Sequence, residues 1–320
     1  MNNVKDMRFY KGISLFIKTI VLAASFYYII QKISTSPSLF SSDAIRFTSK
    51  SVGCLLLAIV LVCCNWGLEA RKWQVLISSF EDISWLRSFQ SILTGVAFGI
   101  FTPNRVGEFS GRIFFLKKAD KIAASLRSFF GSFVQLMITV IAGCIAVICY
   151  AQNNFNRSLR LQSYLDPQKK GQLLIFVLLV LLVAVAVFKV PYFAKWKHHF
   201  KTFLKIPRSE LIQVIFLSTI RYFVFTLQFY LILIALGLNI EFVSALILIA
   251  ITFLITSAVP TFALTEIVVR SAIAVSVFAV IETPQPEIAT AASFLLWVMN
   301  LAIPALIGSL FIGKLQFFKA

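Results

Sequence analysis

The chain has 320 residues, of which 59% are hydrophobic and 13% are charged, and its mean hydropathy is +0.89. Soluble domains are about 45–50% apolar and about 25% charged, so this composition excludes a soluble enzyme, a disordered chain and a disulfide scaffold. It predicts an all-α polytopic membrane protein. The net charge is +17, but Lys and Arg lie between long apolar runs, so we expect no nucleic-acid partner.

Apolar runs of about 20 residues, the length that crosses a bilayer, predict about six full spans. In chain order they cover residues 12–33, 51–70, 122–150, 172–188, 211–237 and 288–312. The first could be a signal peptide, but Lys18 interrupts it and we expect a span. Aromatic and basic residues separate onto two faces in 191–206, which predicts an amphipathic helix in the membrane plane. It would serve as an anchor or gather anionic lipid.

Two further apolar regions are interrupted by a proline. Residues 86–101 and 109–116 flank Pro103, and residues 242–259 and 261–281 flank Pro260. Because proline breaks a helix, these regions predict two broken helical hairpins. Either each hairpin enters the membrane only partway and returns to the side it entered from, or the hairpins cross fully and the chain has eight spans.

The basic residues divide unevenly between the two sides of the membrane. If both hairpins return, 19 Lys and Arg lie on the side of the two termini and seven on the other. Because cytoplasmic loops carry the excess of basic residues, both termini are predicted to be cytoplasmic. Residues 1–320 then form a single integral membrane domain.

The two interrupted regions resemble each other. Each proline is followed by Glu and, four residues later, by Arg, as Glu108/Arg112 and Glu266/Arg270. The first hairpin would enter from inside and the second from outside. This pattern predicts an inverted repeat with halves at about 1–150 and 170–320, joined by the polar stretch 152–171.

Charges at bilayer depth cost about 2.5–3.5 kcal/mol each or more, so four of them beside two helix breaks suggest function. Glu and Arg at this spacing share a helix face and can pair. They could form a substrate or ion site, with Arg suited to phosphate, fix helix packing as internal salt bridges, or lie at the interface. Gly107 and Gly111 predict close helix packing or, alternatively, direct approach of a headgroup to the backbone.

Other polar residues interrupt the spans. Asn65 and Glu69 end the second span and indicate an interfacial anchor, unless Glu69 or Arg71 borders a site. Arg127 and Arg221 are expected to extend toward the inner surface from the ends of their spans.

Two further observations concern the course of the final span and the absence of a predicted metal site. Asn300 and Pro304 predict a kink toward the cavity. The five cysteines lie in apolar runs without a CxxC pair, and the two histidines are adjacent in a basic loop. We therefore expect no metal and no cofactor.

Residues 103–112, Pro-Asn-Arg-Val-Gly-Glu-Phe-Ser-Gly-Arg, resemble the P-x-R-x-G-E-x-x-R signature of the lysylphosphatidylglycerol synthase transmembrane-region family, also called flippase-like domain proteins. Arg71-Lys72-Trp73 is similar to that family's Arg/Trp end of the same helix. Residues 260–266 resemble its later motif, although the family usually has several glycines where this chain reads Thr-Phe-Ala-Leu-Thr. The matching residues are Pro103, Arg105, Gly107, Glu108 and Arg112, and more loosely Pro260 and Glu266.

The resemblance implies a multi-pass protein of the plasma (inner) membrane that transports a phospholipid or a lipid-linked precursor. The founding members carry an additional aminoacyltransferase domain, for which this chain has no room, so we expect no enzyme activity. The partner would be an anionic phospholipid or a polyprenyl-phosphate lipid. An alternative is a non-transporting subunit that supports a partner membrane enzyme, such as a glycosyltransferase or a lipid-modifying enzyme. An intramembrane enzyme and an ion-coupled solute carrier are further alternatives.

Each residue of the two motifs then has an expected role. Arg105, Arg112 and Arg270 would contact a phosphate-bearing headgroup. Glu108 and Glu266 would hold those arginines or bind a cationic group. Pro103 and Pro260 would create the breaks, with Gly107 and Gly111 beside the first one.

Overall fold

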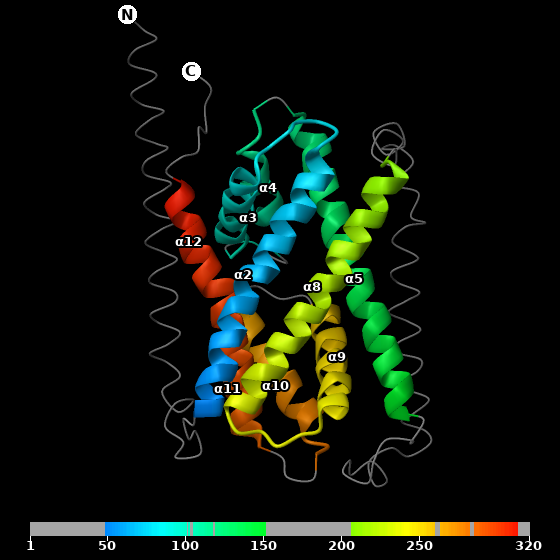
Figure 1. Ribbon diagram of the computed structural model, residues 1–320, viewed down its shortest axis with the longest axis vertical. Coiled ribbons are helices and arrows are strands. Elements are labelled where there is room, and N and C mark those ends of the chain that lie inside the picture. The colour runs from blue at the N-terminus through cyan, green and yellow to red at the C-terminus, as the bar shows by residue number, and fades with distance from the viewer. Residues whose placement is uncertain are drawn as a thin grey trace, which may run out of the picture.

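The computed structural model describes residues 49–100, 102, 105–117, 119–151, 206–259, 263–281 and 285–312. Every regular element within these ranges is a helix (Figure 1). Several predictions lie outside the described residues: the spans at 12–33 and 172–188, the amphipathic helix at 191–206 except its last residue, the linker 152–171, Pro103 and Pro260.

Four long helical segments are apolar and long enough to cross a bilayer. They are α2 (Ser49–Ile77), α5 (Lys121–Ala151), α8 (Arg208–Ala235), and a composite helix of α11 (Pro286–Trp297), η4 (Val298–Ala302) and α12 (Ile303–Phe311). They confirm long apolar helices at the spans predicted over 51–70, 122–150, 211–237 and 288–312. The chain is therefore a multi-pass helical membrane protein.

The end of α2 differs from the prediction. The helix continues to Ile77, past the predicted end at residue 70. Lys72, which the charge count placed in the inner loop region around the first hairpin, is only 1% exposed, and the neighbouring Trp73 is 0% exposed. The assignment of Lys72 to a loop is wrong, because a nearby buried carboxylate stabilises its charge inside the helix bundle.

The first interrupted region forms the hairpin of α3 (Trp85–Gly99) and α4 (Gly107–Ile113). At 1.5 Å per residue, α3 is about 22 Å long and α4 about 10 Å, both shorter than the hydrocarbon core of about 30 Å. The Glu81 carboxylate before the hairpin accepts hydrogen bonds from the backbone of Lys117 and Ala119 after it, at 2.8 and 3.1 Å. The hairpin therefore enters and leaves at the same end of the bundle.

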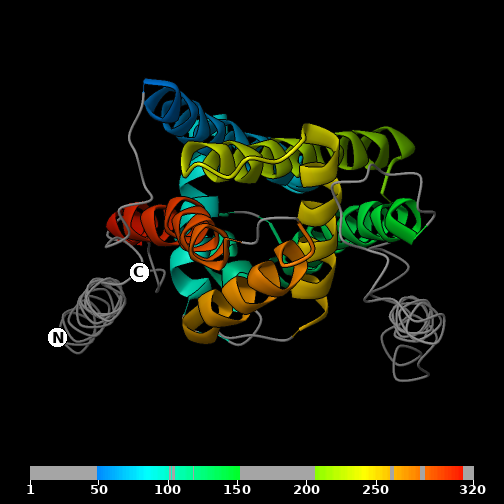
Figure 2. The ribbon, with the colours of Figure 1, turned by 90° about the horizontal axis from the view of Figure 1, so that it is seen from below.

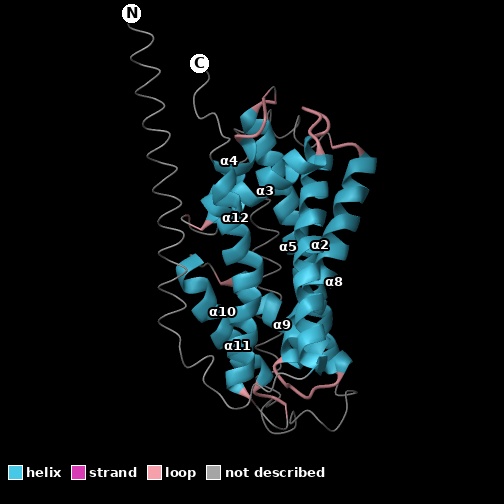
Figure 3. Cartoon of the chain, turned by 60° about the vertical axis from the view of Figure 1, so that its left-hand side comes forward, coloured by secondary structure: helices cyan, strands magenta, loops and turns pink. Residues whose placement is uncertain are grey.

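The second interrupted region forms the hairpin of α9 (Phe242–Ala258) and α10 (Ala263–Phe278). It occupies the opposite end of the bundle from α3 and α4 (Figures 1 and 3). Two hairpins that enter from opposite ends are the arrangement expected of an inverted repeat. The repeat boundaries themselves stay a prediction.

The long helices hold the hairpins in place. Along one face of the bundle α2 packs against α8 (Figure 2). The first hairpin packs through α3 against α12, and the second packs through α9 against α5 and through α10 against α11. Each hairpin thus contacts an element from the other half of the chain.

Glycines bring α3 and α4 into direct contact. A Cβ atom on Gly111 would lie 2.6 Å from Gly95 Cα, and one on Gly99 would lie 2.5 Å from Glu108 Cγ. A Cβ on Gly107 would overlap the Phe98 carbonyl. The packing interpretation of Gly107 and Gly111 is therefore confirmed, and this packing presses the Glu108–Arg112 turn against α3.

Candidate functional site

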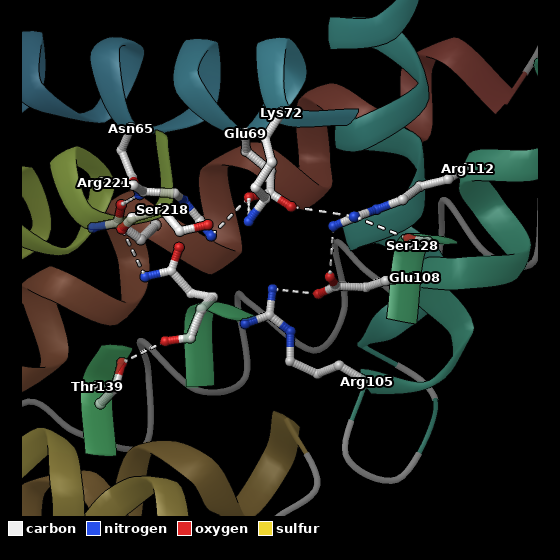
Figure 4. Close-up of polar contacts among 12 residues, drawn as sticks. Asn65, Glu69, Lys72, Arg105, Glu108, Arg112, Ser128, Thr139, Ser218 and Arg221 are labelled. Atoms are coloured by element: carbon white, nitrogen blue, oxygen red, sulfur yellow. Dashed lines mark hydrogen bonds and ion pairs between the residues drawn. The ribbon is translucent and has the colours of Figure 1, made fainter. Parts of the chain in front are cut away.

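A buried carboxylate of α2, Glu69, lies at the centre of an ion-pair network (Figure 4). Its Oε2 atom binds Lys72 Nζ at 2.6 Å and Arg221 Nη1 at 2.9 Å, and its Oε1 atom binds Arg112 Nη1 at 3.1 Å. Glu69 is 2% exposed, so these cations rather than water stabilise its charge. Because they come from α2, α4 and α8, this carboxylate connects three elements.

A second carboxylate, Glu108 of α4, extends the network toward the hairpin tip. Its Oε2 atom binds Arg112 Nη2 at 3.3 Å and its Oε1 atom binds Arg105 Nη2 at 2.5 Å. Arg112 also donates to Ser128 Oγ of α5 at 3.1 Å. Arg112 therefore bridges Glu69 and Glu108, with its side chain only 4% exposed.

The network carries more positive than negative charge. Four cations, Lys72, Arg105, Arg112 and Arg221, surround the two carboxylates of Glu69 and Glu108. With all groups ionised, the formal charge of these described side chains is +2. An uncompensated charge at membrane depth is costly, so this excess favours a bound anion.

Arg105 owes its position to an unusual backbone conformation at the hairpin tip. Its φ angle is +59°, a region that residues other than glycine seldom adopt. Thr102 stabilises the turn, because its hydroxyl accepts from Gly107 N at 2.7 Å and donates to Gly99 O at 3.1 Å. Such strain clusters at functional sites, where neighbouring contacts maintain it.

A cavity of about 540 Å³ lies between the tips of the two hairpins. Its charged lining comes from Arg105 at the first tip, Arg221 of α8, and Glu266 and Arg270 of α10. Aromatic side chains form much of the remaining wall, namely Trp66, Tyr222, Phe225, Phe253 and Trp297. The cavity thus combines three guanidinium groups with aromatic surfaces.

The second Glu/Arg pair stands on the far side of this cavity from the network. Arg270 Nη2 binds Glu266 Oε1 at 2.7 Å, and the side chains are 16% and 9% exposed. Glu266 is also close enough to attract the Arg105 guanidinium electrostatically. The pair adds no net charge, so the +2 excess of the network is also that of the whole cavity region.

Amide side chains fix the wall behind Arg221. Asn65 accepts from Arg221 Nε at 2.9 Å and donates to Asn300 Oδ1 at 3.0 Å. Asn300 donates to Gln228 Oε1 at 2.9 Å, and Gln228 donates to the Ala58 carbonyl at 3.1 Å. Asn300 lies in the π-helical turn η4 of the last span, the region for which the sequence predicted a kink.

The structure brings all five predicted site residues to one region. Arg105, Glu108 and Arg112 belong to the network, and Glu266 and Arg270 line the same cavity. Arg112 itself lies behind the cavity wall, so the expectation that it contacts a headgroup directly is not what this geometry favours. It holds the two carboxylates instead.

For three residues of the site, the interpretation from the sequence differs from what the structure shows. Glu69 was assigned to an interfacial anchor or to the border of a site, whereas it is the centre of the network. The predicted extension of Arg221 to the membrane surface is wrong, because Glu69 and Asn65 bind it inside the bundle. Lys72, three residues after Glu69, could have been recognised as its i,i+3 partner.

Two other arginines lie away from the cavity. The predicted surface extension of Arg127 is also wrong, because it is 3% exposed, binds Glu210 at 3.0 Å and covers the Phe80 ring at 5.1 Å. Arg71 is exposed and donates to Gln74 at 2.6 Å, so it does not border the site. Among the residues that the structure describes, no group of His, Cys, Asp and Glu side chains could hold a metal ion.

Comparison with known proteins identifies one family. The model of the family described as the lysylphosphatidylglycerol synthase TM region matches residues 16–308. This range contains both hairpins and every residue of the network and cavity. Searches of curated proteins and of solved structures returned no match.

Proposed function

The chain belongs to the lysylphosphatidylglycerol synthase TM region family, and from this membership and its cationic cavity we propose that it transports a phosphate-bearing lipid across the plasma membrane. The observation that carries the proposal is the excess of two positive charges between the hairpin tips. The substrate would be a phospholipid or a lipid-linked precursor, and the role would be transport rather than catalysis.

The cavity suits a lipid headgroup in size and chemistry. Small-molecule sites measure about 300–1,000 Å³, and this cavity is about 540 Å³. Arginine presents several N–H donors in a planar fork that matches phosphate oxygens. Arg105 and Arg221 have side chains 31% and 20% exposed, more than the other cations of the network. They are the residues that we assign to phosphate contact, with Arg270 as the third.

The carboxylates have a supporting role. Glu69 and Glu108 hold Arg221 and Arg105 in position, and Arg112 links the two carboxylates. Glu266 holds Arg270 and attracts Arg105 across the cavity. When an anion enters, Arg105 and Arg270 can turn part of their donor set toward it without leaving their carboxylates.

The hairpins suggest how the site opens to each side. They enter from opposite ends (Figure 3), and the cavity between them is lined by Arg105 of the first hairpin and by Glu266 and Arg270 of the second. Transporters of inverted-repeat design keep a fixed midplane site and move one half against the other. In the present chain, such a movement would separate Arg105 of the first hairpin from Glu266 of the second and would open the cavity to one side of the membrane.

Reconstitution into vesicles tests this proposal. Protein in vesicles that contain a labelled phospholipid should move the label between leaflets, as followed by chemical quenching from outside. Arg105→Gln and Arg270→Gln should slow this movement about tenfold or more, because each removes a charge-assisted phosphate contact. Arg71→Gln, which removes an exposed arginine of α2, is the matched control and should transport normally.

The outcomes separate the hypotheses. Equal transport by wild type, Arg105→Gln and Arg270→Gln would contradict a role for the cavity. Lipid binding without any transport by the wild type would contradict a transporter and leave the supporting subunit of a partner membrane enzyme as the better hypothesis.

A further inference from the structure

We propose that the cavity selects a phosphate group with two negative charges, a phosphomonoester or a diphosphate, over a singly charged phosphodiester. This inference rests on the proposed function, since it specifies the headgroup that the same cavity accepts. It follows from the charge of the network, from donors that lack partners, and from the way the other polar groups of the wall are used.

The charge balance gives the first argument. The cations of the network outnumber its carboxylates by two, and the Glu266–Arg270 pair leaves that excess unchanged. A phosphodiester would cancel one of these charges and leave the other unbalanced in a low-dielectric site. A phosphomonoester, at about −1.5 to −2 near neutral pH, would cancel nearly both. The site is therefore better matched to a dianion.

Unused donors give the second argument. Among the described residues, Arg105 Nε, Arg270 Nε and Trp66 Nε1 are buried without a hydrogen-bond partner, and all three side chains line the cavity. A buried donor without a partner is unfavourable, so a ligand rich in acceptors would be stabilised. Terminal phosphates carry three strong acceptor oxygens, and a phosphodiester has only two non-bridging ones.

The amide side chains behind Arg221 and the hydroxyls of the wall give the third argument. Asn65, Gln228 and Asn300 hydrogen bond with one another and with Arg221, so these amides have few donors left for a sugar or another neutral headgroup. The cavity carboxylate, Glu266, is held by Arg270 at 2.7 Å. A cationic amine would have to compete with that guanidinium. The hydroxyls of Thr139, Thr256 and Ser257, which also line the cavity, donate to carbonyls of their own helices, so the guanidinium groups are the main donors left for a ligand.

A binding comparison with matched lipids tests the inference. Purified wild-type protein in mild detergent would be titrated with dioleoyl phosphatidic acid and with dioleoyl phosphatidylglycerol, which share acyl chains but present a monoester and a diester. We expect at least about tenfold tighter binding of phosphatidic acid, from one additional charge-assisted interaction. Native mass spectrometry would measure the bound fraction. Because the comparison uses wild-type protein, it does not depend on a variant that folds.

Variants and soluble probes sharpen the result. Arg105→Gln should reduce the preference to about threefold or less by removing one of the two excess charges, whereas Arg71→Gln should keep it. Equal binding of the two lipids by the wild type would overturn the dianion inference and leave the proposed function intact. If neither lipid bound saturably, both the dianion inference and the proposed function would be overturned.

Glycerol 3-phosphate and pyrophosphate test whether the lipid chains matter. Binding of either compound as tight as that of phosphatidic acid would assign the selection to a free phosphate and contradict the lipid function.

Discussion

The two hairpins carry the same Glu and Arg spacing but are built differently. In the first, Glu108 and Arg112 are 12% and 4% exposed, and they join a network that reaches α2, α5 and α8. Within the described residues, Glu266 and Arg270 of the second form ion pairs only with each other. Glycines press α3 and α4 together, whereas residues 242–281 contain no glycine. We therefore expect the first hairpin to be a fixed wall of the cavity and the second to be the side that adapts to a ligand.

Removal of Glu69 should have the largest effect. Glu69→Gln leaves Lys72 and Arg221 buried without their carboxylate, and loss of one partner of a buried ion pair costs about 3–5 kcal/mol. We expect a large fall in Tm in detergent, or aggregation during purification. Glu287→Gln, on the exposed first turn of α11, is the control. A Glu69→Gln variant as stable as this control would show that the network does not stabilise the first hairpin.

A larger residue at the contact between α3 and α4 should cause the second-largest loss of stability. Gly111→Ala places a methyl group 2.6 Å from Gly95 Cα, and such overpacking costs about 1–3 kcal/mol. Gly53→Ala is the matched control, because nothing lies within 4 Å of its added Cβ, and it should be neutral or stabilise α2 by up to about 1 kcal/mol. Thermal unfolding in detergent measures both. Equal Tm values for the two variants would mean that α3 and α4 are not in close contact.

A substitution in the second hairpin should weaken lipid binding and leave the stability of the protein nearly unchanged. Arg270→Gln breaks one partly exposed pair, so its Tm should stay close to that of the wild type. Lipid affinity should fall about tenfold, since one phosphate contact is worth about 1.4 kcal/mol or more. A Tm decrease as large as that of Glu69→Gln would remove the proposed difference between the hairpins.

The smallest expected effect concerns the strained tip. Arg105→Gly and Arg105→Ala both remove the guanidinium, but only glycine accepts a φ of +59° without strain. The glycine variant should be more stable by about 1 kcal/mol, with lipid binding reduced equally in both. If alanine were the more stable, the tip would not adopt the left-handed conformation in solution.

Local patterns in the sequence were sufficient to predict the hairpins and part of the site. The proline-interrupted apolar runs predicted α3, α4, α9 and α10 nearly to their ends, and the i,i+4 spacing predicted that Glu108 pairs with Arg112. Both signals lie within a few residues along the chain. Whether each hairpin returns partway or crosses the membrane fully is a pair of alternatives that charge counting cannot separate.

The ion pairs at the centre of the network could not be predicted without knowing how the helices pack. Glu69 and Arg221 lie on different helices, α2 and α8, and nothing near either residue in the sequence indicates the other. Lys72 resembled a loop residue because it stands between Arg71 and Trp73, a common arrangement at membrane surfaces. Fully buried lysine is rare unless paired, and the pairing of Lys72 depends on a helix that continues past the predicted end of the span.

The central claim is that the cavity between the hairpin tips holds a lipid phosphate. The most direct test is native mass spectrometry of wild-type protein, Arg105→Gln and Arg71→Gln, each purified in mild detergent from the same host. We predict that wild type and Arg71→Gln retain one phosphate-bearing lipid at defined stoichiometry and that Arg105→Gln has lost it. The same nonspecific lipid mixture on all three proteins would contradict the claim and leave the Glu/Arg network with a structural role.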